Sequence, residues 1–463
     1  MEYDLIIIGS GPGGYVAAIR ASQLGMKTAV VEKESLGGIC LNWGCIPTKS
    51  LLKSAEVYEY VKHASDYGVK IEGSAVPDFG KVIERSRSIA EAMSKGVQFL
   101  FKKNKIEVLP GYGRLVDKQT VEVTDPNGKK NKYKSNHIIL ATGARSRELP
   151  NLKQDGKKII GYREAMSLKE LPASMVVVGS GAIGSEFAHF YNAMGTKITL
   201  VEFMPTLVPL EDEEVSKQLE RSFKKAGMTI LTSSTVESVD ASGDKCKVKI
   251  KTAKGNEELE ADIVFSAVGI APNLENLGIE ELGVRVDKGK IQVDKFMQTS
   301  VQGVYAIGDI VPGPALAHKA SAEGILCVEK MAGKNPNPIR YDNIPACTYT
   351  HPEIASVGLT EKAAKEAGYE IRVGKFPYSA SGKASSAGQK EGFIKLIYDV
   401  KYGELLGAHM IGANVTELIA EIVVARNLET TGHEIIKSIH PHPTMSEAIM
   451  EASAAAYNEV IHI

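Results

Sequence analysis

A strand, turn, helix and second strand follow one another twice in this chain, and no other feature restricts its fold as strongly. A short apolar run leads each time into a glycine-rich turn, first at Gly9 to Gly14 and again at Gly179 to Gly184. In both copies an acidic residue, Glu32 or Glu202, stands 23 positions after the first glycine. One glycine pattern is a weak signal, but its repetition with identical spacing predicts two β-α-β units that each bind a dinucleotide.

Each turn needs glycine for three reasons: the turn is tight, the backbone approaches a pyrophosphate, and the helix packs on its strand. The glycines concerned are Gly9, Gly11 and Gly14, then Gly179, Gly181 and Gly184. Glu32 and Glu202 are placed to accept hydrogen bonds from ribose hydroxyls. Because a carboxylate there repels a 2′-phosphate, NAD is expected rather than NADP at the second site. The alternative for Glu202 is a solvated residue at a strand end.

Length and composition bound the class of protein. The 463 residues suffice for about three domains. The 55 basic and 56 acidic residues leave a net charge of -1, which gives no electrostatic footprint for nucleic acid or anionic lipid. No apolar run approaches membrane-span length, and Met1 leads directly into the first predicted strand without a signal segment. We therefore expect a cytoplasmic protein that binds neither nucleic acid nor membrane. The alternative is an organellar protein from which a transit peptide has been removed.

The remaining chain indicates the fold class. A helix is predicted over Arg87–Asn104, between the two glycine patterns. From Tyr341 onward such patterns stop, and alternation in Phe393–Tyr398 is typical of antiparallel strands. The prediction is an α/β protein with two Rossmann-like dinucleotide-binding domains and a C-terminal α+β domain.

Two cysteines, Cys40 and Cys45, follow the first glycine turn closely. No further Cys or His cluster supplies a second ligand pair, so a reversible disulfide is preferred over a metal site. Pro47 in the first turn of a following helix would put Cys45 near a helix N-terminus, which stabilises a thiolate. The alternative is two unlinked cysteines on a loop. The other cysteines, Cys246, Cys327 and Cys347, are expected to be small buried hydrophobic residues.

A turn near the C-terminus holds two histidines between prolines, His440-Pro441-His442-Pro443. Glu447 stands five residues after His442. A rigidly held imidazole with a carboxylate partner is a candidate general base for a thiol. The alternative is that His442 is an ordinary surface or core histidine.

Together these motifs resemble those of the flavin-dependent pyridine nucleotide-disulfide oxidoreductases along essentially the whole chain, and are most similar to members that oxidise dihydrolipoamide. The matching segments are Gly9–Gly14, Gly37–Lys49, Ala141–Gly143, Gly179–Glu186, Tyr305–Asp309, Ala317–Ala320 and the terminal His-Pro turn. The resemblance implies residues 1–145 as the first part of an FAD-binding domain and 146–271 as an NAD-binding domain. Residues 272–340 would complete the FAD domain, and 341–463 would form a dimerisation domain.

The resemblance also implies two cofactors, FAD and NAD, and the residues that hold them. Glu32 would lie on the adenosine ribose of FAD, with Lys49 near the isoalloxazine. The other FAD positions would be Gly113, Thr142, Gly143, Asp309 and Ala317. NAD would lie along Gly179 to Glu186, with Glu202 on its ribose and Gly269 alongside. Glu186 would also pair with Lys49.

The implied mechanism is a relay of electrons from a dithiol to NAD. His442, oriented by Glu447, would remove a proton from protein-bound dihydrolipoamide, and the resulting thiolate would attack Cys40. Cys45 would hold a thiolate against the flavin. The His-Pro turn would come from the other subunit, which implies a homodimer. The expected partners are lipoyl domains of 2-oxoacid dehydrogenase or glycine cleavage complexes.

Two alternatives remain beside this activity. A glutathione-type or other disulfide reductase would favour arginines for NADPH after the second acidic strand, where this chain has Phe203 and Met204. A non-catalytic flavoprotein scaffold would need neither the cysteine pair nor the His442 turn. One departure from the family pattern is Ile270–Asn273, which lacks the arginine that many members carry there.

Overall fold

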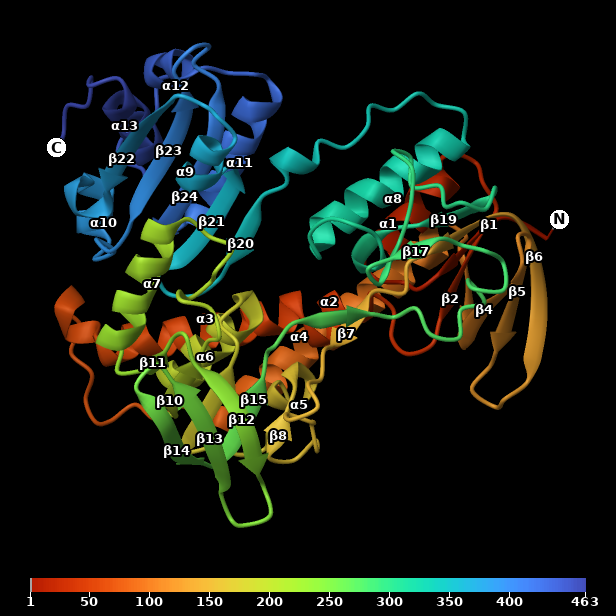
Figure 1. Ribbon diagram of the computed structural model, residues 1–463, viewed down its shortest axis with the longest axis horizontal. Coiled ribbons are helices and arrows are strands. Elements are labelled where there is room, and N and C mark those ends of the chain that lie inside the picture. Colours follow the sequence, from red (N-terminus) through yellow and green to blue (C-terminus); the bar gives the residue numbers. More distant parts are fainter. Residues whose placement is uncertain (1) are drawn as a thin grey trace. The chain divides into compact units, whose positions relative to one another are not determined.

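The computed structural model describes residues 2–463, which divide into two compact units (Figure 1). The first unit combines the chain up to Leu51 with Gly80–Arg147 and Ile270–Ile339. The second combines Leu52–Phe79, Glu148–Gly269 and Arg340–Ile463. Each unit is therefore built from segments that lie far apart in the sequence.

A mainly parallel sheet forms the centre of the first unit, in the order β3-β2-β1-β6-β5-β4 with β19 also paired to β6. The parallel strands are β1 (Tyr3–Ile8), β2 (Thr28–Glu32), β3 (Glu107–Pro110), β6 (Lys130–Leu140) and β19 (Val304–Ala306). Two antiparallel strands, β4 (Tyr112–Asp117) and β5 (Thr120–Thr124), extend the sheet beyond β6. The apolar run in β1 is almost fully buried, as expected of a parallel strand covered on both faces.

Helices cover the sheet of the first unit. Helices α1 (Pro12–Gln23) and α8 (Ala317–Met331) lie side by side (Figure 1). Glycine at position 324 allows this close approach, because a Cβ there would lie only 2.8 Å from the carbonyl oxygen of Gly13. The other elements here are α2 (Gly38–Trp43), the first residues of α3 (Cys45–Lys62), nearly all of α4 (Phe79–Lys103) and η2 (Gly308–Ile310). Two short strand pairs also belong to this unit, β7 (Ala144–Ser146) with β16 (Ile270–Pro272) and β17 (Val286–Asp287) with β18 (Lys290–Ile291).

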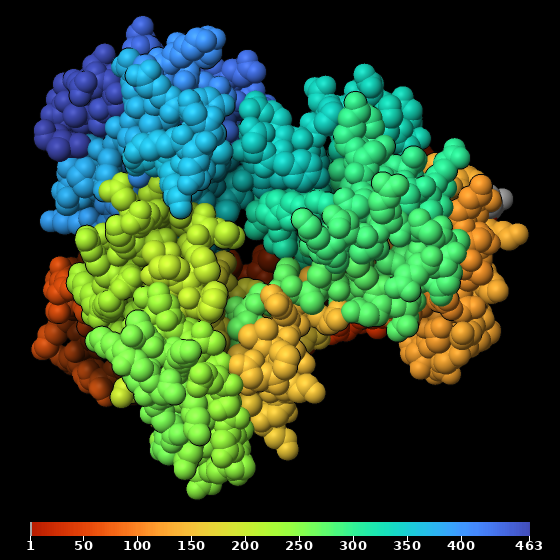
Figure 2. Space-filling view, viewed as in Figure 1, coloured from red at the N-terminus to blue at the C-terminus, as the bar shows by residue number. Residues whose placement is uncertain are grey.

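A second parallel sheet, in the order β11-β10-β9-β15-β8, begins the second unit. Its strands are β8 (Ile159–Ile160), β9 (Ser174–Val178), β10 (Lys197–Val201), β11 (Thr229–Leu231) and β15 (Ile263–Ser266). The helices of this part are α5 (Tyr162–Ala165), α6 (Ala182–Met194) and α7 (Glu213–Lys225). Three antiparallel strands, β12 (Thr235–Asp240), β13 (Cys246–Thr252) and β14 (Gly255–Ala261), form a separate sheet, which is green and lies at the bottom of Figure 2.

An antiparallel sheet in the order β20-β21-β24-β23-β22 forms the C-terminal part of the second unit. Its strands are β20 (Ala346–Thr348), β21 (Glu353–Gly358), β22 (Ile371–Pro377), β23 (Phe393–Asp399) and β24 (Leu405–Gly412). The helices are α9 (Glu361–Glu366), α10 (Gly382–Ser386), α11 (Val415–Asn427), α12 (Gly432–Lys437) and α13 (Glu447–Ala456), and short 3₁₀ turns lie at η3 (Tyr341–Asn343) and η4 (Tyr378–Ala380). A further 3₁₀ turn, η1 (Ala64–Tyr67), lies in the segment Leu52–Phe79 of the same unit. The predicted α/β class, with two Rossmann-like parts and a C-terminal α+β part, is confirmed.

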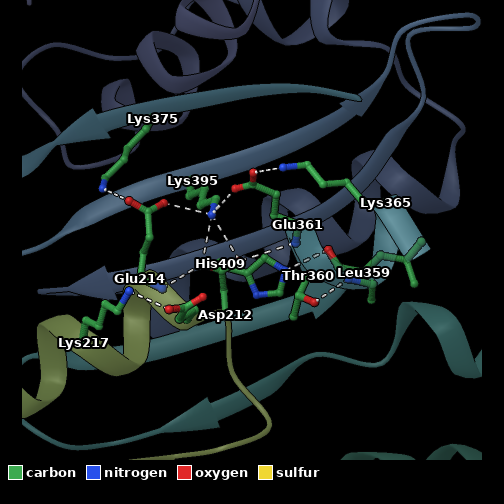
Figure 3. Close-up of polar contacts among 12 residues, drawn as sticks. Asp212, Glu214, Lys217, Leu359, Thr360, Glu361, Lys365, Lys375, Lys395 and His409 are labelled. Atoms are coloured by element: carbon green, nitrogen blue, oxygen red, sulfur yellow. Dashed lines mark hydrogen bonds and ion pairs between the residues drawn. The ribbon is translucent and has the colours of Figure 1, made fainter. Parts of the chain in front are cut away.

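A buried lysine joins α7 and α9 to the C-terminal sheet. The strand predicted at Phe393–Tyr398 is β23, and every one of its residues is buried. The ammonium of Lys395 lies 3.0 Å from Asp212, 2.9 Å from Glu214 and 2.7 Å from Glu361 (Figure 3). Because three carboxylates surround it, Lys395 stays charged inside the protein.

Some local predictions need correction or refinement. The helix predicted over Arg87–Asn104 begins eight residues earlier, at Phe79, and ends at Lys103. Cys246 and Cys327 are buried as predicted, whereas Cys347 is only partly buried. Within residues 2–463, no helix combines the length and apolar character that crossing a membrane requires.

Candidate active site

The two glycine-rich turns have the same geometry in the two units. Gly9 and Gly179 have φ values of +105° and +97°, a region that favours glycine. A Cβ on Gly9 or Gly179 would lie 2.3 or 2.5 Å from a backbone oxygen at the end of the neighbouring strand. A Cβ on Gly14 or Gly184 would lie 2.0 or 1.9 Å from the carbonyl oxygen of the first glycine of its turn. The fold itself therefore requires these four glycines.

Gly11 and Gly181 differ, because a Cβ on either would meet no described atom within 4 Å. Each residue caps the N-terminus of a helix, α1 or α6. The first amides of a helix lack partners within the helix and favour an anion. Open space in front of two such helix ends fits the pyrophosphate groups of two dinucleotides.

The two acidic residues of the repeated pattern make the same contacts. Glu32 Oε2 accepts hydrogen bonds from the backbone N–H and the hydroxyl of Ser10, at 2.9 and 2.6 Å. Glu202 Oε2 accepts the equivalent bonds from Ser180, both at 2.7 Å. In each case Oε1 accepts from the backbone N–H two residues later, at 2.9 or 2.8 Å. The predictions missed these serines, although serine at the second position of both turns was a visible signal.

Cys40 and Cys45 form a disulfide, with their Cα atoms 4.7 Å apart. The predicted linkage is confirmed, and the alternative of two unlinked cysteines is wrong. Cys40 lies in the short helix α2, and Cys45 is the first residue of α3. Thr48 fixes this helix start, because its N–H and its hydroxyl both donate to the Gly44 carbonyl oxygen, at 3.1 and 2.6 Å. The positive end of α3 therefore lies at Cys45, where it stabilises a thiolate.

The segment that carries the cysteines packs directly on the first glycine turn. The N–H of Gly37 donates to the carbonyl and hydroxyl oxygens of Ser10, both at 3.2 Å. A Cβ on Gly38 would lie 2.7 Å from the Cα of Gly11. The side chain of Asn42, between the cysteines, donates to two carbonyl oxygens at 3.0 and 2.9 Å and holds α2 in place. A dinucleotide on the first turn would therefore lie beside the disulfide segment.

A second turn of the first unit is fixed by reciprocal hydrogen bonds. The hydroxyl of Thr142 donates to the carbonyl oxygen of Asn273 at 2.7 Å, and the side-chain amide of Asn273 donates back at 3.0 Å. The N–H of Asn273 also donates to the Gly143 carbonyl oxygen at 2.9 Å. Asn273 belongs to the segment Ile270–Asn273, which departs from the family pattern. Its hydrogen bonds hold the turn that contains Thr142 and Gly143, two of the predicted cofactor residues.

Gly113 lies in β4 and has a packing role. A Cβ there would lie 3.1 Å from side-chain carbons of both Ile8 and Val31, closer than core atoms normally approach. Packing alone therefore explains glycine at this position, and contact of Gly113 with a cofactor stays a prediction.

Asp309 lies on a turn that a buried ion pair holds. Lys319 and Glu323, both fully buried on α8, lie 3.1 Å apart. Lys319 donates to the carbonyl oxygen of Gly308 at 2.9 Å, and Glu323 accepts from the Gly308 N–H at 2.7 Å. Burial raises the pKa of Asp309, while Lys319 and Lys290 oppose that shift. The predictions missed this ion pair, and the i, i+4 spacing of Lys319 and Glu323 was the only sequence signal for it.

The remaining predicted cofactor residues lie in both units. Ala317 is the first residue of α8, and Lys49 lies one turn after Cys45 on α3. In the second unit Glu186 is buried on α6 and accepts a hydrogen bond from the Tyr349 N–H at 3.0 Å. Gly269 follows β15 with a φ of +107°. The pairing of Lys49 with Glu186 stays a prediction.

His442 and Glu447 form the predicted pair in the C-terminal part. Nδ1 of His442 lies 2.8 Å from Glu447 Oε1, and the N–H of Thr444 donates to Oε2 at 2.8 Å. Although burial raises the pKa of Glu447, these two hydrogen bonds hold it below its ordinary value. An ionised carboxylate only accepts, so Nδ1 carries the proton and Nε2 is left as the basic nitrogen. The His442 side chain is 80% exposed, so Nε2 can reach a thiol outside this chain.

His440 is anchored differently from His442. Its Nε2 lies 2.9 Å from Glu421 Oε1, and its Nδ1 lies 2.9 Å from the carbonyl oxygen of Ser438. Because both ring nitrogens are occupied, His440 is a fixed point at the start of the turn. The histidine that remains available is His442.

Known proteins resemble this chain over its whole length. Residues 3–324 match the pyridine nucleotide-disulphide oxidoreductase family, and residues 344–453 match its dimerisation domain. A dihydrolipoyl dehydrogenase of Rhizobium etli is 50% identical over 100% of this chain and 99% of its own. One from Zymomonas mobilis is 47% identical over 100% and 99%. The crystal structure of LpdA from Mycobacterium tuberculosis superposes with a TM-score of 0.90 at 27% identity, covering 99% of this chain and 100% of that chain.

Proposed function

Because this chain belongs to the pyridine nucleotide-disulphide oxidoreductase family, we propose that it oxidises dihydrolipoamide to lipoamide with NAD⁺ as the electron acceptor, as a dihydrolipoyl dehydrogenase does. One observation carries the proposal beyond family membership. Cys45 begins α3, and Gly37 and Gly38 of the segment that carries the disulfide pack on the first dinucleotide turn, which supports a thiol-reducible bond beside a cofactor site.

FAD and NAD are the cofactors of this family, and the two glycine turns fit them. We assign FAD to the first turn, with Glu32 on its ribose, and NAD to the second, with Glu202 on its ribose. Lys49, Thr142, Gly143, Asp309 and Ala317 would complete the FAD site, and Gly113, Glu186 and Gly269 are further proposed contacts. When bound, FAD would take up an electron pair from the dithiol form of the protein and deliver it to NAD⁺ as a hydride.

These assignments give each segment of the chain a proposed role. Residues 1–145 and 272–340 would bind FAD, residues 146–271 would bind NAD, and residues 341–463 would form the contact between subunits. Support for this division comes from the positions of the two glycine turns and from the dimerisation-domain match at residues 344–453.

The protein's own residues carry out the thiol chemistry in two steps. Nε2 of His442 accepts a proton from one substrate thiol, and the hydrogen bond to Glu447 stabilises the imidazolium that forms. The substrate thiolate attacks the sulfur of Cys40, and Cys45 leaves as a thiolate at the N-terminus of α3. The second substrate sulfur then displaces Cys40, which takes the second proton, and lipoamide leaves as a cyclic disulfide.

The dimerisation-domain match supports a homodimer. We propose that each active site combines the disulfide of one subunit with His442 and Glu447 of the other, which agrees with the exposure of the His442 ring. The proposed protein partners are lipoyl domains of 2-oxoacid dehydrogenase or glycine cleavage complexes. A cytoplasmic location, where thiols stay reduced, suits the three unlinked cysteines.

The direct test compares substrates on the purified holoenzyme. We expect a yellow protein that forms NADH with dihydrolipoamide far faster than with glutathione, and that prefers NAD⁺ over NADP⁺. Cys45→Ser should keep FAD bound but lose the thiolate–flavin absorbance after reduction. A colourless protein, or one that prefers glutathione, would overturn the proposal, and an unchanged reduced spectrum of Cys45→Ser would contradict the role given to that sulfur.

A further inference from the structure

Three consecutive residues of helix α4 hydrogen-bond to the segment that carries the disulfide. Arg85 donates to the carbonyl and hydroxyl oxygens of Ser50, at 3.0 and 2.7 Å. The hydroxyl of Ser86 donates to the carbonyl oxygen of Pro47 at 3.0 Å. These two contacts hold the first turns of α3, after the cysteines. The third residue, Arg87, instead contacts the last residues of α2, within the loop that the disulfide closes.

The guanidinium of Arg87 is held on that loop in two ways. Its Nη2 donates to the carbonyl oxygen of Asn42. Its central carbon lies 4.0 Å from the centre of the Trp43 ring, a cation–π contact. Asn42 and Trp43 both lie between Cys40 and Cys45. A planar guanidinium can stack and donate at once, so arginine fits this position better than lysine.

Arg87 keeps a positive charge in a partly buried place. The residue is half-buried, and burial lowers the pKa of its guanidinium without removing its charge. Its Nη1 is buried and finds no hydrogen-bond acceptor within residues 2–463. An incompletely paired buried cation costs folding free energy. Since packing could be satisfied by a neutral side chain, the charge itself needs an explanation.

Reduction of the disulfide creates the opposite charge nearby. The S–S bond breaks, two electrons arrive from the substrate dithiol, and uptake of one proton leaves one thiol and one thiolate. The Cα atoms of the cysteines are only 4.7 Å apart, so Asn42 and Trp43 lie within a short closed loop. A positive charge held against Asn42 and Trp43 is partly buried and therefore weakly screened, so it favours the anionic form of a thiol in the same loop.

We propose that Arg87, held in place by Trp43, is a positioning residue that makes the Cys40–Cys45 disulfide easier to reduce by stabilising the thiolate of the reduced pair. The inference deepens the proposed function and depends on it for the identity of the reductant. Arg87 does not act alone, because Lys49 and the N-terminus of α3 also contribute positive charge near Cys45. Loss of Arg87 should therefore shift the redox equilibrium without abolishing reduction.

The test measures the redox equilibrium of the disulfide itself. Holoenzyme is equilibrated with mixtures of reduced and oxidised dithiothreitol, quenched with iodoacetamide, and the alkylated fraction of the Cys40–Cys45 peptide is measured by mass spectrometry. For Arg87→Gln we expect half-reduction to need an about tenfold higher ratio of reduced to oxidised dithiothreitol, which corresponds to about 30 mV for two electrons. The thiols of the reduced variant should also react with iodoacetamide about three- to tenfold more slowly at neutral pH.

Matched variants separate charge from packing. Arg85→Gln removes the neighbouring arginine, which bonds to Ser50 rather than to the loop, and should shift the midpoint ratio by less than about twofold. Arg87→Lys keeps the charge and should recover most of the shift. Trp43→Phe weakens the cation–π contact and should give an intermediate shift of about threefold. If Arg87→Gln fails to fold, the midpoint ratio of Trp43→Phe, compared with that of the unaltered protein, tests the proposal instead.

The proposal is overturned if the midpoint ratio of Arg87→Gln stays within about twofold of that of the unaltered protein. If Arg87→Gln does not fold, the same criterion applies to Trp43→Phe. Equal shifts for Arg85→Gln and Arg87→Gln would also overturn it, because they would reflect general loosening of α4. The assay uses dithiothreitol and needs no turnover. It can therefore support the role of Arg87 even if dihydrolipoamide proves not to be the substrate.

Discussion

Nδ1 of His442 and Oε1 of Glu447 lie 2.8 Å apart, and this hydrogen bond sets which ring nitrogen is basic. Glu447→Gln keeps the size of the side chain but provides an amide that can donate to Nδ1, which favours the wrong tautomer. We expect kcat with dihydrolipoamide to fall about 100-fold, the usual scale for general-base catalysis. Steady-state rates of NADH formation measure this effect.

Two controls accompany the Glu447 variant. Reduction of an artificial quinone by NADH bypasses the substrate thiols and should stay within about twofold of the unaltered rate. Glu421→Gln alters the carboxylate that contacts His440, and should cost far less activity. If Glu447→Gln retains full dithiol activity, His442 does not depend on Glu447 for its tautomer.

Gly181 and Gly184 should respond in opposite ways to the same substitution. Gly181→Ala places a methyl group in open space before α6, so the thermal unfolding midpoint should not change. The same methyl group would occupy the space that we propose for the pyrophosphate of NAD⁺, so NAD⁺ affinity should fall more than about tenfold. Gly184→Ala puts its Cβ 1.9 Å from the Gly179 carbonyl oxygen and should destabilise the fold. Unfolding curves and NAD⁺ titrations of both variants check this, and unaltered NAD⁺ binding by Gly181→Ala would refute the assignment.

Glu202 should decide between NAD⁺ and NADP⁺. Removal of the charge in Glu202→Gln should weaken the proposed hydrogen bond to the ribose of NAD⁺ and remove the repulsion of a 2′-phosphate. We expect KM for NAD⁺ to rise about tenfold and the preference over NADP⁺ to narrow. Glu32→Gln, the same change in the first copy, should instead weaken FAD retention. If Glu202→Gln weakened FAD retention and Glu32→Gln raised KM for NAD⁺, the two turns would have to exchange their assigned cofactors.

Acid should loosen the Lys395 cluster (Figure 3). Hydrogen bonds from Lys365 and Lys395 lower the pKa of Glu361 to about 2. Burial opposes such a shift at Glu214, but bonds from Lys375 and Lys395 still lower its pKa. A lowered folded-state pKa adds stability at pH values above the unfolded pKa of about 4.3, and that stability is lost as the pH falls toward 2. The free energy of unfolding should therefore fall steadily below about pH 5.

Lys395→Met tests the origin of this acid sensitivity. Removing the cation leaves carboxylates without their shared partner and should cost about 3 to 5 kcal/mol at neutral pH. The difference from the unaltered protein should shrink as acid neutralises those carboxylates. Lys217→Met breaks an exposed pair with Glu213 and should cost less than about 1 kcal/mol. Urea unfolding from pH 7 to pH 3 checks both variants, and equal costs would show that burial of Lys395 has no special weight.

The sequence was sufficient for the fold class and the disulfide because both depend on local patterns. The spacing from Gly9 to Glu32, and its repetition, follow from the geometry of a single β-α-β unit. The start of α4 was missed by eight residues, although Phe79, Val82 and Ile83 follow helical spacing. The contact from Ser86 to Pro47, which helps to hold this part of the helix, was not visible in the sequence.

Contacts between distant segments could not be predicted. The strand predicted at Phe393–Tyr398 gave no sign of the ion pairs of Lys395, because its partners Asp212 and Glu361 are far away in sequence. Arg87 was visible only as part of a predicted helix, and nothing in its neighbourhood indicates Trp43 as its partner. Periodicity reports which face of an element is apolar, but it does not report what covers that face.

The close approach of Gly38 to Gly11 limits how this enzyme can be rebuilt. A chimera that grafts the cysteine segment of another disulfide reductase onto this nucleotide turn must keep glycine at position 38. Any side chain there would place its Cβ 2.7 Å from the Cα of Gly11. The junction of such a chimera is better placed after Ser50, so that the nucleotide turn and the cysteine segment come from the same parent protein.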